Sequence, residues 1–175
     1  MRTIQPIGQR QQRRVTAATE RCIARANVLL EACVANIPVY FDLSGRTAGQ
    51  YRTARGRRVI RYNPYLFAKY FNENVATTVP HEVAHYLIDA IYGQRNVKPH
   101  GNEWRNMMQL LGAEASVRAD FDLAGIPTRR YRRIPYECRC RVHQLTRIRH
   151  NRVQGKSSRY FCRVCGTELV PAADS

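Results

Sequence analysis

The sequence predicts an α+β fold in two parts: a compact domain of helices with a small antiparallel sheet, then a small β module held together by a metal ion. Three observations predict it. A helix-forming stretch at residues 79–88 has the spacing His-Glu-x-x-His. Segments with strand-like alternation precede it within residues 37–63. Close pairs of metal-binding side chains follow at residues 138–165. A chain of 175 residues has room for one domain and such an appendage.

The N-terminal part of the chain predicts a long helix. Residues 1–13 are polar and basic and are expected to form a flexible arm. Apolar residues recur at helical spacing over residues 14–35. Cys22 and Cys33 fall on this apolar stripe, where a helix would hold them about 16 Å apart. That separation exceeds the limit of roughly 7 Å for a disulfide, so both are expected to be core thiols.

The predicted sheet lies between this helix and the histidine motif. Strand patterns cover residues 37–43, 48–51 and 58–63, and two glycine-containing turns separate them. A helical or irregular piece is expected after Asn63-Pro64, through Phe71. An edge strand of such a sheet can bind an extended peptide through main-chain hydrogen bonds.

The spacing of His81 and His85 predicts a metal site. Residues four apart on a helix lie on one face, so both imidazoles can bind one metal ion. Glu82 lies at the edge of that face, where it can take a proton from water as a general base. Pro80 fits the first turn of this helix, and Gly93 is suited to end it.

A catalytic zinc site needs a third protein ligand. His100 is favoured because Pro99 and Gly101 place it in a turn. Glu103 is the alternative, although it falls inside the next predicted helix, which Asn102 is expected to cap and which runs to about residue 111.

Three further expectations concern the residues near this site. Trp104 is expected to pack in the core. Residues 113–126 could form a short helix or a loop. No oxyanion-stabilising residue stands out, and Tyr86 and Tyr92 are candidates only because they are near in sequence.

The C-terminal cysteines predict a structural metal site. Cys162 and Cys165 form a Cys-x-x-Cys pair followed by a glycine, and Cys140 and His143 have the same spacing. These four are the preferred ligands, with Cys138 as the substitute for a four-cysteine set. So small a module cannot build a sufficient core without such a metal.

The charge of the chain predicts a polyanionic partner. The net charge is +16, from 29 Lys+Arg against 13 Asp+Glu. Residues 46–69 contain seven basic residues and no acidic one, and residues 129–165 contain twelve basic residues and one acidic. Such blocks favour phosphate binding, so nucleic acid is the expected partner, and lipid ranks below it.

The basic residues are expected to lie along a linker at residues 129–135 and along a β-hairpin between the cysteine pairs. Tyr160 and Phe161 are the candidate rings for stacking on bases. The hairpin residues concerned are Arg147, Arg149, His150, Arg152, Lys156 and Arg159. This surface is typical of proteins that bind single-stranded or junction DNA, and DNA is preferred to RNA.

The sequence also indicates in which cellular compartment the protein is expected. No segment is apolar over the length of a signal peptide or a membrane span. A cytoplasmic protein with reduced thiols is therefore expected.

Taken together, His-Glu-Val-Ala-His, then Pro-His-Gly-x-Glu-Trp, then the C-terminal Cys/His cluster resemble the SprT family, bacterial relatives of the DNA-dependent protease Spartan. The resemblance implies a zincin-like metalloprotease domain at residues 14–128 and a zinc ribbon at residues 136–171. It implies one catalytic zinc bound by His81, His85 and His100, with Glu82 as general base, and one structural zinc. It further implies protein substrates that are bound or crosslinked to DNA.

Two other functions remain open from the sequence alone. One is a nucleic-acid-binding factor in transcription or repair whose zinc is purely structural; Glu82 argues against it, because a structural site needs no base. The other is a hydrolase acting on nucleic acid itself. It ranks last, because the region offers few carboxylates for a two-metal site: Glu82, Asp89 and Glu103.

Overall fold

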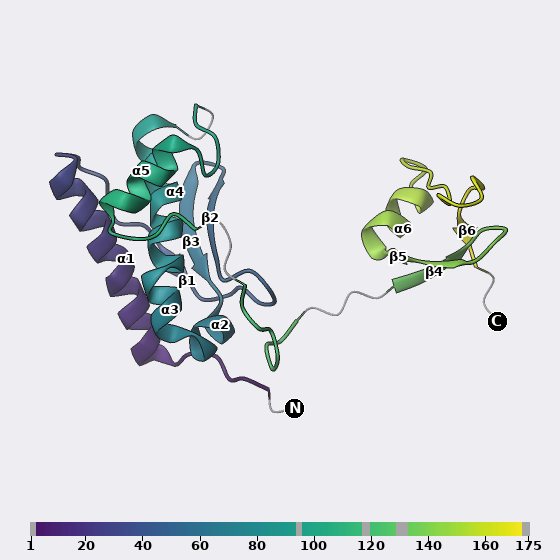
Figure 1. The fold of residues 1–175 in the computed structure, drawn as a ribbon, viewed down its shortest axis with the longest axis horizontal. Helices are drawn as coiled ribbons and strands as arrows, with labels where there is room; N and C mark the ends of the chain where they lie inside the picture. Colours follow the sequence, from purple (N-terminus) through teal and green to yellow (C-terminus); the bar gives the residue numbers. More distant parts are fainter. Residues whose placement is uncertain (1–2, 94–95, 117–119, 129–132, 173–175) are drawn as a thin grey trace. The chain divides into compact units, whose positions relative to one another are not determined.

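The structure, a computed structural model, describes residues 3–93, 96–116, 120–128 and 133–172. The chain forms two compact units, Met1–Thr128 and Arg129–Ser175, each with its own hydrophobic core (Figure 1). The first unit contains α1 (Gln9–Leu29), β1 (Val39–Tyr40), β2 (Gly49–Ala54), β3 (Arg57–Tyr62), α2 (Pro64–Lys69), α3 (Phe71–Ala76), α4 (Thr78–Tyr92) and α5 (Asn102–Leu110). The second contains β4 (Arg133–Glu137), β5 (Val142–Thr146), α6 (Arg147–Gln154) and β6 (Val170–Pro171).

Helix α1 begins earlier than the sequence pattern predicts. Gln9–Leu29 is helical, so the expected flexible arm is wrong from Gln9 onward, and residues 1–2 of it lie outside the described residues. The segment before the helix is fixed because Ile7 is buried and its N–H donates to the Pro64 carbonyl at 3.1 Å. The Gln12 side chain also donates to the Ile7 carbonyl at 3.1 Å.

Helix α1 also ends earlier than predicted, at Leu29. Asn27 reverses the chain, because its side chain exchanges two hydrogen bonds of 2.9 Å with the main chain of Val34. Cys33 therefore lies beyond the helix and is exposed, contrary to the prediction of a core thiol. Cys22 packs against the core, and its burial raises the pKa of its thiol.

The sheet of the first unit is mixed, with the strand order β1-β3-β2. Strands β2 and β3 form an antiparallel hairpin whose turn residues Arg55 and Gly56 both have positive φ. Strand β1 pairs parallel to β3, so the predicted antiparallel sheet is wrong for this strand. The predicted turn at Gly45 exists, but it does not close a β1–β2 hairpin, because the Gly45 N–H donates to Pro127 and the Gly45 carbonyl accepts from Asn63.

Asn63 is a buried polar anchor between the loop before β2 and the helix that follows β3. Its Oδ1 accepts from the main-chain N–H groups of Tyr65 and Leu66 and caps α2, as the Asn-Pro pair predicts. Its Nδ2 donates to the carbonyls of Gly45 and Thr47. A single side chain therefore satisfies main-chain groups of two segments.

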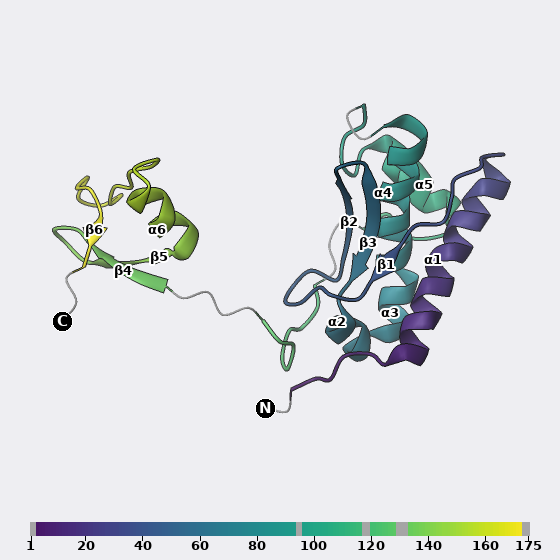
Figure 2. The same ribbon diagram turned by 180° about the vertical axis from the view of Figure 1, so that it is seen from behind.

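Helix α4 is the central element of the first unit. It lies between α1 on one side and strands β2 and β3 on the other (Figures 1 and 2). It begins at Thr78 with Pro80 in its first turn and ends at Tyr92, and Gly93, whose φ is +79°, is its C-cap residue, as predicted. A helix packed on several sides must be apolar nearly all round, which fits its largely buried sequence.

Helix α5 packs its predicted face against α4, and Trp104 is only 1% exposed. Gly101 rather than Asn102 is the N-cap residue, and no side chain caps this helix. Residues 113–116 and 120–128 contain neither helix nor strand, which settles the open choice for this segment in favour of a loop within those ranges.

The second unit is a three-stranded antiparallel sheet of order β5-β4-β6. Its core is formed by Tyr136, Leu145, Cys162 and Leu169. Strand β4 starts at Arg133, inside the predicted linker, and residues 129–132 of that linker lie outside the described residues. The predicted β-hairpin between the cysteine pairs is wrong: helix α6 follows β5 directly, because the Thr146 hydroxyl accepts from the Arg149 N–H as an N-cap.

Within the part of the chain that the structure describes, none of the helices combines the length and the apolar character that a lipid bilayer span requires.

We predict that Asn63→Ala lowers the free energy of unfolding by roughly 3 kcal/mol, because it leaves buried main-chain groups without partners. Denaturant unfolding measures the loss. Asn102→Ala is the matched control, since Asn102 is exposed in the first turn of α5 and caps nothing, and it should change stability by less than about 0.5 kcal/mol. Equal losses in the two variants would contradict the role of Asn63.

Candidate functional site

Three histidines converge on one point of the first unit. His81 and His85 extend from adjacent turns of α4, and His100 reaches them from the turn before α5. The Nε2–Nε2 distances are 3.3 Å for His81–His85, 3.0 Å for His85–His100 and 3.2 Å for His81–His100. Nitrogens this close can bind one metal ion together.

The third member of the cluster is His100, as favoured from the sequence. His100 adopts a positive φ of 57°, in a turn closed by a hydrogen bond from the Gly101 N–H to the Lys98 carbonyl. Glu103, the alternative, does not belong to any group of converging metal-binding side chains among the described residues. The turn thus directs the histidine toward α4, while the glutamate follows inside helix α5.

Trp104 packs against the three imidazoles. Its ring centroid lies 4.9 Å from that of His81, 5.8 Å from His85 and 4.7 Å from His100. Its indole Nε1 donates to the His81 carbonyl at 3.5 Å. Trp104 is therefore a core residue, as predicted, and also limits how far the histidine rings can rotate.

The histidines are held in the form that binds metal. Burial lowers the pKa of His81 to about 4 and that of His85 to about 3, and it lowers the pKa of His100 as well. All three imidazoles are therefore neutral at neutral pH, as metal ligands must be. The main chain of Ser116 hydrogen-bonds the His81 ring and opposes part of its pKa shift. Such a contact fixes the orientation of a ligand ring.

Glu82 lies beside the histidines on α4 and is only 7% exposed. Its Oε2 accepts a hydrogen bond of 2.6 Å from the Tyr51 N–H on strand β2. Burial raises the pKa of Glu82 to about 7, and the Tyr51 N–H opposes this shift. A carboxylate with a pKa near neutrality can both accept and return a proton at physiological pH.

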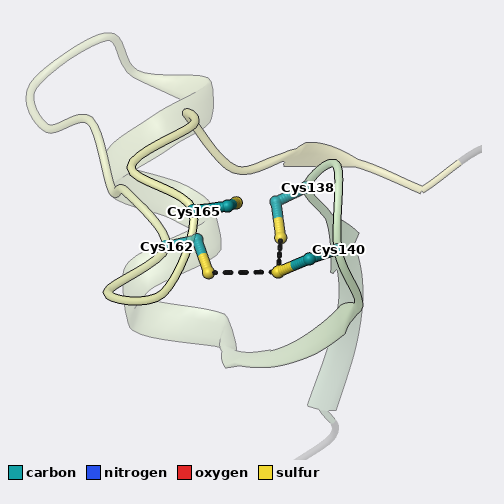
Figure 3. A group of neighbouring side chains, drawn as sticks. All are labelled: Cys138, Cys140, Cys162 and Cys165. Carbon is teal, nitrogen blue, oxygen red and sulfur yellow. Dashed lines mark hydrogen bonds between the residues drawn. The ribbon is translucent and has the colours of Figure 1, made fainter.

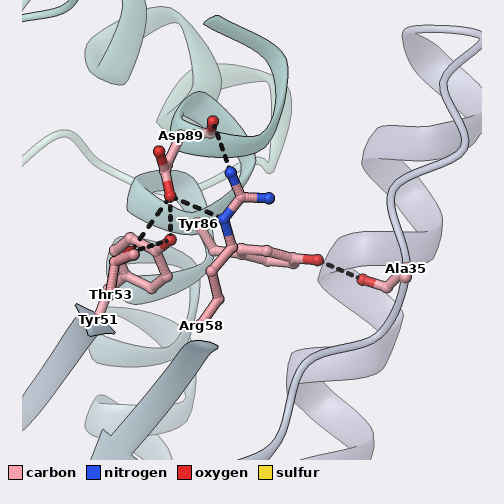
Figure 4. A network of polar contacts seen from close by, with 6 residues as sticks. All are labelled: Ala35, Tyr51, Thr53, Arg58, Tyr86 and Asp89. Atoms are coloured by element: carbon pink, nitrogen blue, oxygen red, sulfur yellow. Dashed lines mark hydrogen bonds and ion pairs between the residues drawn. The ribbon is translucent and has the colours of Figure 1, made fainter. Parts of the chain in front are cut away.

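A polar network ties the sheet to α4 one turn after His85 (Figure 4). The Asp89 Oδ2 accepts from the Tyr51 hydroxyl, from Thr53 Oγ1 at 3.3 Å and from Arg58 Nε at 2.9 Å. Burial and the bond to Asp89 raise the pKa of Tyr51 to about 12, so its hydroxyl stays protonated and donates. The network fixes β2 and β3 against the helix that carries the histidines.

The two tyrosines considered as oxyanion donors differ in their surroundings. The Tyr86 hydroxyl donates to the Ala35 carbonyl at 2.7 Å, beside α1 (Figure 4). Tyr92 is 50% exposed in the last turn of α4, two turns beyond His85. Tyr51 also lies beside the site, because it lines a cavity of ≈ 70 Å³ together with His85 and Trp104.

Four cysteines gather in the second unit (Figure 3). Cys138 and Cys140 lie in the connection between β4 and β5, and Cys162 and Cys165 form the second pair. The Sγ–Sγ distances are 3.5 Å for Cys138–Cys140 and 3.7 Å for Cys140–Cys162. Every pair of the four sulfurs lies within 4.8 Å, close enough to bind one metal ion.

Cys138, the predicted substitute, therefore joins Cys140, Cys162 and Cys165 in place of the preferred His143. The His143 Nε2 lies 3.3 Å from the Cys138 sulfur but is not one of the group defined within the described residues. His143 lies in the β4–β5 ladder opposite Tyr136, whereas Cys138 and Cys140 lie in the connection between the two strands. A Cys-x-Cys pair can be brought together there.

The second cysteine pair is surrounded by hydrogen-bond donors. Main-chain hydrogen bonds from Cys165 and Val164 lower the pKa of Cys162 to about 5. The Thr167 hydroxyl and main chain lower the pKa of Cys165. Both thiols are thus biased toward the thiolate, which is the form that binds metal.

The basic residues that were expected on a hairpin lie on α6 and on the chain after it. Arg149 lies over the Tyr160 ring at 5.5 Å, and Arg159 over the Phe161 ring at 5.7 Å. Tyr160 packs against the core of this unit, while Phe161 is 55% exposed. Of the two rings considered for base stacking, Phe161 is the accessible one.

Comparisons with known proteins place this arrangement in a family. The family model described as SprT-like matches residues 19–131. The chain is 38% identical over 160 residues to Protein SprT of Klebsiella pneumoniae and 31% identical over 159 residues to that of Pasteurella multocida, covering 92% of each relative and 91% and 90% of this chain. It is 44% identical over 111 residues to Protein SprT of Serratia proteamaculans, covering 62% of that protein and 63% of this chain. No solved structure matches at a significant level. The chain belongs to the SprT-like family.

Proposed function

We propose that the first unit is a zincin-like, zinc-dependent metalloprotease. The observation that carries the proposal is the buried Glu82 carboxylate, with its pKa near 7, beside three converging neutral imidazoles. A purely structural metal site has no need of such a base. The donor set also fits zinc, which binds histidine nitrogen readily.

The chain's own residues would divide the reaction as follows. A zinc ion bound by His81, His85 and His100 would polarise a peptide carbonyl and lower the pKa of water. Glu82 would accept the proton of the attacking water and deliver it to the leaving amine. Trp104 and the Ser116 main chain would hold the imidazoles in place throughout.

Strand β2 is the proposed substrate-binding edge. It lies at one end of the sheet order, next to β3, and packs on α4 (Figure 2). An extended peptide can bind such an edge by main-chain hydrogen bonds, with its side chains directed alternately to either side. Because Tyr51 on β2 contacts Glu82, a peptide on this edge would pass beside the general base.

The proposed substrates are proteins on DNA, and the second unit is the proposed DNA-binding module. Its four cysteines fit a structural zinc site. Support for DNA comes from its basic side chains and the exposed Phe161 ring, which suit phosphates and an unstacked base, respectively. The proposed basic contacts are Arg147, Arg149, Arg152, Lys156 and Arg159, of which Arg159 also pairs with Glu168.

A nucleic-acid-binding factor without protease activity is the second candidate, because the same basic unit would support it. A hydrolase acting on nucleic acid itself has less support. Asp89 is bonded to Tyr51, Thr53 and Arg58, and Glu103 lies outside the histidine group within the described chain. Of the three carboxylates considered for a two-metal site, only Glu82 then remains.

We predict that Glu82→Gln lowers cleavage of a purified DNA-binding protein by about 100-fold or more, because it removes the base. Zinc content should not change, since Gln can still accept from the Tyr51 N–H and the histidines remain. The assay is run with and without single-stranded DNA, and Glu103→Gln, an exposed change on α5, is the matched control. Zinc-loaded wild type that binds DNA but never cleaves would contradict the protease and leave the binding factor.

We predict that Cys138→Ser accelerates zinc loss from the second unit to a chelator, whereas His143→Gln does not, because Cys138 and not His143 belongs to the sulfur cluster. Chelator absorbance against time in the full chain measures the rate. Faster zinc loss from His143→Gln than from Cys138→Ser would instead support a Cys₃His ligand set.

A further inference from the structure

Gly49 lies where β2 comes closest to the metal-binding helix. A Cβ atom at this position would lie 2.6 Å from Glu82 Cγ, 2.8 Å from Glu82 Oε1 and 2.7 Å from Thr78 Cγ2. All three distances are shorter than real Cβ contacts. Gly49 is not among the glycines with positive φ, so it is required for space rather than for backbone conformation.

Neither neighbour of Gly49 can easily move away. Thr78 and Glu82 are both 7% exposed and lie one turn apart on α4. The Thr78 hydroxyl donates to Asn74 Oδ1 at 2.8 Å, which fixes its side chain. A larger residue at position 49 would therefore displace the Glu82 carboxylate or the strand itself.

Tyr51 forms a second contact between strand β2 and Glu82. Its N–H donates to Glu82 Oε2 at 2.6 Å, two residues along the strand from Gly49. Gly49 therefore provides the room that the glutamate side chain occupies, and the Tyr51 amide fixes one of its oxygens. The strand and the helix together hold the carboxylate in one position.

The hydrogen bonds to Asp89 hold β2 against α4, in the position that the contacts of Gly49 and Tyr51 with Glu82 require. The Tyr51 hydroxyl and Thr53 Oγ1 both bond the Asp89 carboxylate, two turns of α4 after Glu82 (Figure 4). Arg58 on β3 bonds the same carboxylate and also the Asp89 carbonyl. The strand is thus attached to α4 both at Glu82 and at Asp89.

We propose that Gly49 and the Tyr51 amide are positioning elements for Glu82, with Asp89 as their anchor. This inference rests on the proposed function, because it assigns β2 a second role besides peptide binding. In that role, β2 positions the carboxylate of the general base, Glu82. Gly49 acts through Glu82, since the atoms nearest to a Cβ at this position belong to Glu82 and Thr78.

The test is Gly49→Ala in the full zinc-loaded chain, assayed on a purified DNA-binding protein with single-stranded DNA. We expect kcat to fall about 100-fold, since a shift of about 1 Å at a reacting group costs that much. KM and zinc content should stay unchanged. Gly8→Ala is the control, because no atom lies within 4 Å of a Cβ at that position. Unchanged kcat in Gly49→Ala, or loss of zinc together with activity, would overturn the inference.

A thermal unfolding cycle separates this inference from the proposed function. Gly49→Ala should lower the Tm of the wild type more than it lowers the Tm of Glu82→Ala, which lacks the Cγ and Oε1 atoms that the new methyl group would meet. Equal Tm losses in both backgrounds would refute the contact. If the wild type does not cleave, the proposed function fails, and the cycle still reports whether Gly49 makes room for Glu82.

Discussion

The burial of helix α4 between α1 and the sheet is the constraint on which the first unit depends. This packing fixes the rotation of the helix, so that His81 and His85 meet His100 while Glu82 is directed to strand β2. Burial also favours uncharged side chains, because removing a charge from water is costly. The same packing therefore gives neutral imidazoles and a glutamate of raised pKa.

The features that depend on local sequence could be predicted. His81 and His85 follow from helical spacing, His100 from the turn formed by Pro99 and Gly101, and the cysteine-rich module from its paired spacings. Pro80 and Gly93 likewise lie at the two ends of helix α4, as expected. In each case the deciding contacts lie within a few residues along the chain, where sequence patterns are most informative.

The features that depend on how strands pair could not be predicted. Gly49 and Tyr51 approach Glu82 only because of the β2–β3 register and the packing of β2 on α4. Likewise, Cys138 joins the group of converging cysteine sulfurs, whereas His143, paired in the β4–β5 ladder, contacts Cys138 without belonging to that group. Gly49 falls in the short strand predicted at residues 48–51, and no local pattern distinguishes a glycine needed for space from one needed for a turn.

We propose that the histidine group and the cysteine group are two zinc sites of different kinds. Zinc K-edge X-ray absorption on the zinc-loaded chain, with zinc counted per chain, tests it most directly. We expect two zinc ions, one with four sulfur ligands at about 2.3 Å and one with nitrogen ligands at about 2.0–2.1 Å and no sulfur. One zinc per chain, with sulfur ligands alone, would contradict the claim that the three histidines form a catalytic metal site.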